Sequence, residues 1–186
     1  DGPHPEGTPC VLRALDAAGV RATFFMVGTE VERHPGIVAD VVAAGHEVAV
    51  HGWEHRSQLM TTAPSAVRDL RRAADVIART SGHRPRWFRP PYGSMSAASL
   101  VAARAAGLRT VLWSSWGRDW GSDATAATIH GSVVTGLLDG GTVLLHDGES
   151  PSSPGNWSAT AAAIEELVGT CRERELEVGC LADHGL

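Results

Sequence analysis

The sequence predicts an α/β fold with a mainly parallel sheet, either open or closed into a barrel. From Thr8 onward, short apolar segments of strand type alternate with segments of helical pattern, which is typical of βαβ units. Chemically active residues follow several of the apolar segments directly, and the carboxyl ends of parallel strands are where such folds place their sites. The 186 residues, 43% apolar and 20% charged, suit one globular domain over residues 1–186.

The chain is expected to begin with a helix followed by a strand. Thr8 and Pro9 have the character of an N-cap and a first helical residue, and Gly19 ends this segment. Residues 22–27 form a short apolar run closed by Gly28, which predicts a strand.

Two more helices and a strand are predicted in the first half. One helix spans residues 35–44 with Gly45 as its stop, and the strand 47–50 follows. The longest helix spans residues 64–80, with its apolar residues on one face and arginines mostly on the other. We interpret the arginines as a solvated face. The apolar face consists of Val67, Leu70, Ala74 and Ile77.

The second half repeats the alternation of strands and helices. Each expected helix is bounded by small or polar residues, and each expected strand is a short apolar run. The strands are 87–88, 110–113 and 142–145, and the helices are 96–106, 124–138 and 158–173, the last leading into 176–181.

Composition excludes several classes of partner. The formal charge of −5 arises from 16 basic and 21 acidic residues spread along the chain, so no polybasic surface for nucleic acid is expected. No apolar run approaches the ~20 residues of a membrane span.

The three cysteines are too few for a disulfide scaffold and are expected as small buried hydrophobes, although Cys171 and Cys180 could pair in an oxidising compartment. A monomer is favoured.

Two histidines directly follow the predicted strand 47–50. His51 and His55 are four residues apart and can reach one metal ion. Neutral imidazole suits zinc, iron, cobalt or nickel. Because the chain has nine histidines, the spacing also arises by chance among solvated loop residues.

Further polar residues follow the other predicted strands. They are Arg89 and Tyr92, then Asp119, then His146 and Asp147. Since the carboxyl ends of parallel strands meet at one edge, we expect these residues and the two histidines to form one site. Taken singly, Arg89 is equally a surface cation, Asp119 a turn residue or helix cap, and His146 a loop histidine.

Six short segments resemble, in order and spacing, the motif series of the polysaccharide deacetylases. This is carbohydrate esterase family 4, also called the NodB-homology domain, and the resemblance covers nearly the whole chain. The segments are 1–3, 22–25, 51–55, 89–93, 118–120 and 144–147.

The resemblance implies a distorted or incomplete (β/α) barrel with one divalent metal ion, most often zinc, with cobalt, nickel or iron as alternatives. Asp1, His51 and His55 would be its ligands. One carboxylate and two imidazoles leave positions open for water and substrate, as a catalytic site requires.

The resemblance also implies roles in acid–base chemistry. His146 would be the general acid, and Asp119 would pair with it and raise its pKa. Arg89 would orient a catalytic base. The backbone N–H of Tyr92 would help hold the oxyanion.

Two apolar residues match the family's pocket for the acetyl methyl group. They are Trp120 and Leu144, for which plain core packing is an equally good account.

The sequence departs from the family pattern in three places. The family has two consecutive aspartates before Gly-Pro, whereas this sequence begins at the second, so the base and the first strand are expected to be missing. Gly52 replaces a Ser or Thr, which predicts a less rigid loop and weaker metal binding. Trp116, Gly117 and Arg118 occupy a segment that often holds another aspartate.

The expected function is metal-dependent removal of acetyl groups from N-acetylated, or O-acetylated, sugars. Chitin, chitooligosaccharides and peptidoglycan are the first candidate substrates and acetylated xylan the next, and secretion or the cell envelope is the expected location. One alternative is a catalytically impaired carbohydrate-binding relic of the same fold.

Two other metal enzymes share parts of the pattern. A zinc metallopeptidase would use the His51-x-x-Glu54-His55 pattern, but that pattern requires a helix. Gly52 and Trp53 argue against a helix here. A non-haem iron oxygenase shares the ligand set but would show an all-β pattern.

Overall fold

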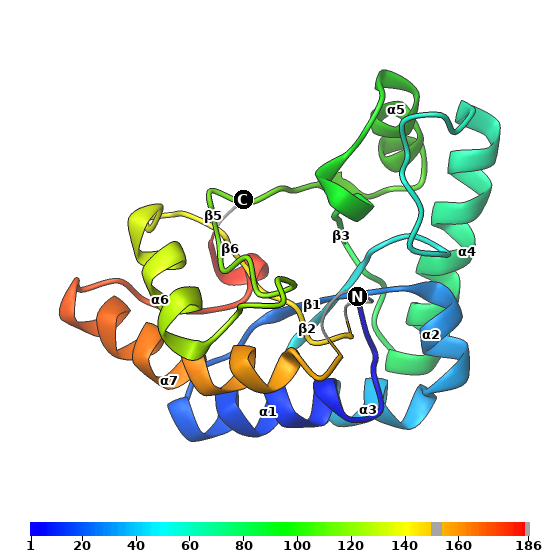
Figure 1. Ribbon diagram of the computed structural model, residues 1–186. Helices are drawn as coiled ribbons and strands as arrows, with labels where there is room; N and C mark the ends of the chain where they lie inside the picture. Colours follow the sequence, from blue (N-terminus) through cyan, green and yellow to red (C-terminus); the bar gives the residue numbers. More distant parts are fainter. Residues whose placement is uncertain (150–153, 185–186) are drawn as a thin grey trace. The chain divides into compact units, whose positions relative to one another are not determined.

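The computed structural model describes residues 1–149 and 154–184 and has an α/β fold with parallel strands (Figure 1). The chain divides into two compact units. The first comprises Asp1–Pro3, Phe24–Ala43 and Val48–Leu112. The second comprises His4–Thr23, Ala44–Glu47 and Trp113–Leu186.

The larger sheet has the strand order β1-β2-β3-β4. Pairing is parallel between β2 and β3, with Val50 opposite Phe88, and between β3 and β4. The ends of β1 and β2 are buried, as expected for parallel strands whose faces are covered by helices. The strands are β1 (Thr23–Met26), β2 (Glu47–Val50), β3 (Trp87–Phe88) and β4 (Arg109–Thr110).

Helix α4 organises the first unit. Its apolar face buries Leu70, Ala73 and Ile77, and it contacts the other three helices of this unit. Helix α5 begins at a capping box in which Ser96 and Ser99 satisfy each other's backbone N–H groups. These helices are α2 (Gly28–Arg33), α3 (Pro35–Ala43), α4 (Ala63–Ser81) and α5 (Ala97–Ala105).

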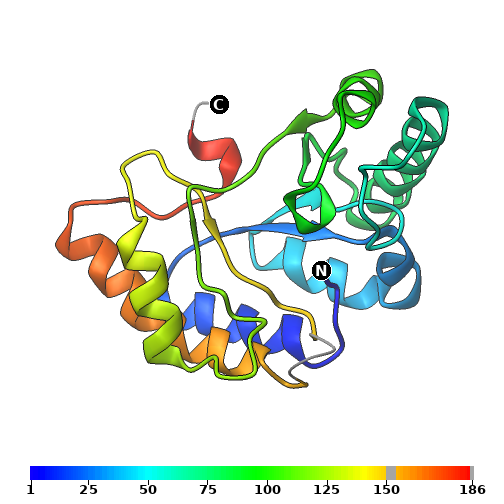
Figure 2. The ribbon, with the colours of Figure 1, turned by 45° about the horizontal axis from the view of Figure 1, so that its top comes forward.

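The second unit is built on three helices and a two-stranded sheet. Helix α7 lies against both α1 and α6 (Figure 2), and Ile129, Val133, Ala163 and Leu167 form a core between α6 and α7. The parallel pair β5–β6 places Trp116 opposite Leu144. The elements are α1 (Gly7–Ala18), β5 (Ser115–Trp116), α6 (Ala126–Thr135), β6 (Val143–Leu144), α7 (Trp157–Glu173) and a 3-10 turn, η2 (Leu181–His184).

Most predicted elements are present, with three corrections. Helix α1 begins at Gly7, so Thr8 lies inside the helix rather than at its N-cap, and its hydroxyl contacts Asp147 instead. Gly28 begins the short helix α2, which the sequence pattern did not indicate. The predicted strand 110–113 ends at Thr110, and the chain enters a second sheet at Ser115.

No helix in the described part of the chain is long and apolar enough to cross a membrane. Cys171 and Cys180 are buried free thiols, as expected for small hydrophobes, and Cys10 is half-buried.

Candidate functional site

Asp1, His51 and His55 converge in the first unit. Each offers one ligand atom, and these atoms all lie within 4.8 Å of one another. Nε2 of His51 is 3.1 Å from Oδ1 of Asp1, and Nε2 of His55 is 3.5 Å from the same oxygen. One carboxylate oxygen therefore faces two imidazole nitrogens, which is a suitable donor set for a single divalent ion.

The local backbone positions two of these side chains, Asp1 and His51. The N–H of Val27, just beyond β1, donates to the carbonyl of Gly2 at 2.9 Å, which holds the segment that carries Asp1. The N–H of His51 donates to the carbonyl of Met26 at 2.8 Å, so His51 leaves the end of β2 still paired to β1. The carboxyl ends of β1 and β2 therefore position Asp1 and His51, two of the three candidate ligands.

His51 is held as a neutral imidazole with a defined tautomer. Its side chain is buried, and Nδ1 lies 2.7 Å from the carbonyl oxygen of Arg89. A carbonyl only accepts, so Nδ1 carries the proton and Nε2 faces Asp1 as a lone pair. Burial, with nearby positive charge, lowers the pKa of His51 well below its usual value. The neutral form is the one that binds metal.

Gly52 gives the loop between the two imidazoles its shape. Its φ is +111°, a backbone conformation that side chains rarely adopt, and a Cβ there would lie 3.1 Å from the carbonyl oxygen of Glu54. The loop is also anchored, because the N–H groups of Gly28 and Thr29 donate to the carbonyls of Gly52 and Trp53 at 2.9 and 3.0 Å. The glycine that departs from the family pattern thus has a conformational reason.

Trp53 packs the same loop against neighbouring elements. The guanidinium of Arg72 on α4 lies 3.4 Å from its ring centroid, and a Cβ on Gly28 would lie 2.5 Å from its ring. This close approach requires glycine at the start of α2.

We predict that Gly52→Ser destabilises the protein by about 1–3 kcal/mol, the cost of an ordinary residue in a strained backbone region. Gly36→Ser is the control, because Gly36 lies in α3 without a positive φ and a Cβ added there would meet nothing within 4 Å. Urea unfolding of both variants measures the difference. Equal stability of Gly52→Ser and the parent protein would contradict the prediction.

Arg89 supports the site through both its backbone and its side chain. The side chain is buried, its guanidinium lies 4.1 Å from the ring centroid of Phe25, and NH2 donates to the carbonyl of Leu112 at 3.2 Å. Burial lowers the pKa of Arg89 to about 10, so the side chain remains charged near neutral pH. Its expected role in orienting a base stays a prediction.

Tyr92 contacts a candidate metal ligand. It lies in the 3-10 turn η1 (Pro91–Gly93) with φ 60° and ψ 9°, a left-handed conformation that non-glycine residues seldom adopt outside strained or functional sites. Its exposed ring meets the His55 ring edge to face, with centroids 4.6 Å apart. The sequence did not indicate this contact, and the oxyanion role of the Tyr92 N–H stays a prediction.

A buried carboxylate organises the second unit. Asp119 is fully buried, and its Oδ1 lies 2.8 Å from Nδ1 of His146. Its Oδ2 accepts from the backbone N–H of His146 and from the hydroxyl of Thr160, both at 2.7 Å. The side chain of Asn156 donates to the Asp119 carbonyl at 2.7 Å. The loops after β5 and β6 and the start of α7 meet at this residue.

Asp119 is ionised and fixes the tautomer of His146. Burial alone raises the pKa of Asp119, but the hydrogen bonds and charge of His146, with the Thr160 hydroxyl, outweigh it and leave the pKa below its usual value. An ionised carboxylate only accepts, so Nδ1 of His146 carries a proton. The atom available for proton exchange with a substrate is therefore Nε2.

Thr160 and Asn156 were missed by sequence reasoning. Both lie at the start of α7, four residues apart, where a hydroxyl and an amide are ordinary for a helix N-terminus. Only the spacing, which places them on one face of the helix, was available as a signal.

One aromatic ring contacts His146, and two more extend from it in a row. The ring of Trp120, 36% exposed, meets the imidazole edge to face with centroids 5.5 Å apart. Trp116 lies between Trp113 and Trp120, with centroids 6.0 and 5.2 Å away. Leu144 ends β6 and is buried. An acetyl-binding role for Trp120 and Leu144 stays a prediction.

Asp147 is tied to the start of α1. The hydroxyl of Thr8 donates to its Oδ2 at 2.6 Å, and a Cβ on Gly7 would collide with its carbonyl oxygen. Close packing thus requires glycine at position 7. Asp147 acts here as a structural acceptor for the helix that begins beside it.

The fold and these two groups of residues define an α/β protein with a candidate divalent metal centre and a carboxylate–histidine pair. A family model described as polysaccharide deacetylase matches residues 1–111. The chain belongs to the polysaccharide deacetylase family, carbohydrate esterase family 4.

Two relatives support this membership. The chain is 34% identical to a chitooligosaccharide deacetylase of Bradyrhizobium sp., covering 96% of this chain and 84% of the relative. It is 32% identical to the peptidoglycan-N-acetylglucosamine deacetylase PgdA of Listeria monocytogenes, covering 79% of this chain but only 31% of that protein.

Solved structures share the fold. A family 4 acetyl xylan esterase from Clostridium thermocellum, in complex with a cobalt ion, superposes with a TM-score of 0.89 at 28% identity and covers 99% of this chain and 86% of its own. A family 4 pseudoenzyme from Bacillus anthracis, at 23% identity, has a TM-score of 0.85 and covers 96% of this chain and 60% of its own, which shows the fold alone.

Proposed function

We propose that this protein is a metal-dependent hydrolase that removes acetyl groups from N-acetylated sugars of an oligosaccharide or polysaccharide. The observation that carries the proposal is the convergence of Asp1, His51 and His55 within 4.8 Å. The names of the relatives, deacetylases of chitooligosaccharides and of peptidoglycan, support this substrate class.

The donor set fits a divalent ion of the zinc type. Two imidazoles and one carboxylate suit zinc, cobalt, nickel or iron better than magnesium or calcium, which prefer oxygen ligands. His51 is already neutral and oriented by the Arg89 carbonyl, so little reorganisation is needed for binding. A bound ion would supply a Lewis acid that polarises the acetyl carbonyl and makes a water nucleophilic near neutral pH.

The chain's own residues supply the proton for the leaving group. Hydrolysis breaks the bond between the acetyl carbon and the sugar nitrogen, and the nitrogen must gain a proton as it leaves. We assign that proton to Nε2 of His146, because Nδ1 is committed to Asp119. Asp119 stays ionised and orients the imidazole by accepting from Nδ1, which leaves Nε2 for the substrate.

Acetate release tests the proposal. The protein is freed of metal with a chelator, reloaded with zinc or cobalt, and incubated with N-acetylated chitopentaose, peptidoglycan or acetylated xylan. We expect acetate from the chitooligosaccharide or peptidoglycan only in the reloaded samples. Failure of every metal to support acetate release from any of these substrates would overturn the proposal, and sugar binding without release would favour a carbohydrate-binding protein.

A further inference from the structure

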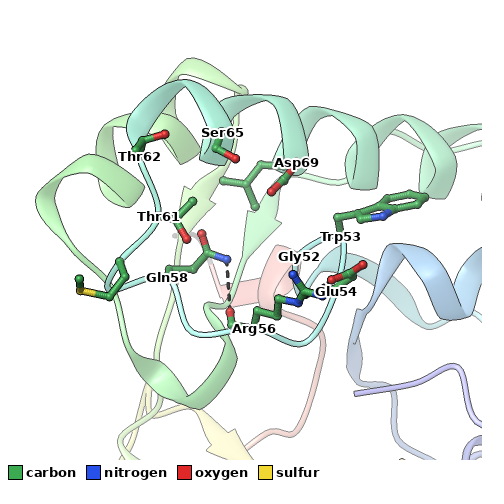
Figure 3. Close-up of a pocket in the computed structure, with 11 residues that line it drawn as sticks. Gly52, Trp53, Glu54, Arg56, Gln58, Thr61, Thr62, Ser65 and Asp69 are labelled. Atoms are coloured by element: carbon green, nitrogen blue, oxygen red, sulfur yellow. Dashed lines mark hydrogen bonds and ion pairs between the residues drawn. The ribbon is translucent and has the colours of Figure 1, made fainter.

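A pocket of about 340 Å³ lies between the loop that leaves β2 and the first turns of α4, within the first unit (Figure 3). We call it the loop pocket. Its walls include Gly52, Trp53 and Glu54, the residues between the two imidazoles, but none of the three candidate metal ligands. The loop pocket therefore shares a backbone segment with the metal centre while remaining a separate cavity.

The buried amide of Gln58 indicates that this pocket can bind a ligand. The residue is only 7% exposed, and its side-chain Nε2 donates to the carbonyl of Arg56 at 3.3 Å. Its Oε1 is buried and has no hydrogen-bond partner among the described residues. Figure 3 shows the amide among the lining residues with its oxygen turned away from Arg56. A buried acceptor left without a donor is unfavourable, so a donor from a ligand fits this position.

The other polar lining groups also favour a donor-rich ligand. Thr61, Thr62 and Ser65 contribute hydroxyls, and Asp69 contributes a carboxylate. Arg56 is ion-paired with Glu54 at 2.6 Å, so the guanidinium is already neutralised. Two carboxylates and one guanidinium leave the lining with net negative charge, which disfavours phosphate and other anions.

The apolar part of the lining suits the carbon face of a sugar. Leu70, which is buried, and Met60, which is 95% exposed and has a flexible thioether, both line the pocket. A volume of about 340 Å³ is at the small end of small-molecule pockets, which fits one sugar unit better than a long chain.

We propose that the loop pocket binds one uncharged, hydroxyl-rich pyranose unit, with Gln58 accepting a hydroxyl or amide N–H and Asp69 accepting a second hydroxyl. The choice of a sugar rather than another polyol rests on the proposed function. Because Gly52 and Glu54 join the pocket to His51 and His55 through the backbone, an occupant here is held beside the loop that carries both imidazoles. Gln58 and Asp69 are thereby assigned as determinants of saccharide binding.

Binding is measured on chelator-treated, ¹⁵N-labelled protein by NMR titration with N,N′-diacetylchitobiose. We expect shifts concentrated in residues 52–70, with affinity reduced about 3- to 10-fold by Gln58→Leu, the equivalent of one lost hydrogen bond. Asp69→Asn should weaken binding similarly. Asp75→Asn on the same helix is the control, since Asp75 is bonded to Arg84 and does not line the pocket.

Several outcomes would overturn the assignment. Shifts absent from residues 52–70, or equal affinity in the parent protein, Gln58→Leu and Asp69→Asn, would show that the pocket does not hold the sugar. A response of the pocket to inorganic phosphate would contradict the charge argument. If Gln58→Leu unfolds, Asp69→Asn alone decides. The titration needs no metal, so it can fail while acetate release succeeds, and the reverse.

Discussion

Replacing His51 with alanine is expected to abolish metal binding and with it acetate release. His51 supplies a buried nitrogen that is neutral, oriented by the Arg89 carbonyl and 3.1 Å from Asp1. Its loss leaves one imidazole and one carboxylate, too few donors to hold a zinc-type ion firmly. Since Lewis-acid stabilisation is worth several kcal/mol, we expect acetate release to fall by about 10³-fold or more.

Metal content and activity are measured on the same sample. Elemental analysis after loading with zinc should give close to one ion for the parent protein and far less for His51→Ala. His83→Ala is the control, because His83 lies in the exposed turn after α4 and its ring contacts the neighbouring Ser81 carbonyl, away from the candidate ligands. Full metal occupancy in His51→Ala would remove this residue from the ligand set.

The metal group was the part of the site most open to prediction. His51 and His55 follow a strand whose bounds, Glu47–Val50, matched the apolar run in the sequence. The three residues between them bring the two ring centroids to 5.1 Å, so the four-residue separation was enough to predict that both rings approach one point. Asp1 was predicted as a ligand from the family resemblance alone. Its position near the two imidazoles depends on the hydrogen bond from the Val27 N–H to the Gly2 carbonyl, which joins segments far apart in the sequence.

Other features depend on contacts that no local pattern encodes. The left-handed backbone of Tyr92 and the positive φ of Gly52 are imposed by turns around the site. From the sequence, Gly52 could be described only as lacking the Ser or Thr side chain of the family. Its positive φ is seen only in the structure. Thr160 and Asn156 reach Asp119 across about forty residues of chain, and such long-range bonds need the tertiary structure.

Elements with strong amphipathicity could be predicted from the sequence, whereas very short elements could not. The bounds of α4 differ from the prediction by only one residue at each end, because its apolar face, Pro64 in its first turn and Gly82 just after its last residue mark it clearly. The six residues of α2 show no such pattern. The same limit applies to β5, whose two residues pair with β6 through a register that tertiary packing sets.

Removing the charge of Asp119 is expected to produce the largest loss of stability. Asp119→Asn keeps the shape but puts an amide where two oxygens now accept three hydrogen bonds, so one donor loses its partner in a fully buried position. Losing hydrogen bonds to a buried charged group typically costs about 1.5–3 kcal/mol for each bond. Asp123→Asn is the control, since Asp123 lies nearby in sequence but is exposed.

The pH dependence of this loss follows from the direction of the Asp119 pKa shift. Because the folded-state pKa lies below the unfolded value, the ionised carboxylate stabilises the fold above the unfolded pKa, about 4. That contribution is lost as the pH falls through the folded pKa. The difference in unfolding free energy between the parent protein and Asp119→Asn should therefore be large at pH 7 and shrink under acid.

Urea unfolding of both proteins from pH 7 down to pH 3 measures this convergence.

The catalytic role of the pair is tested separately by His146→Ala, which should lower acetate release about 10²–10⁴-fold, the usual range for loss of an acid–base group, while metal content stays unchanged. If Asp119 served only to pack the loop, the stability difference would not vary with pH. If His146 served only to fill the space beside Trp120, His146→Gln would retain activity, whereas a proton donor requires the imidazole that Asp119 orients.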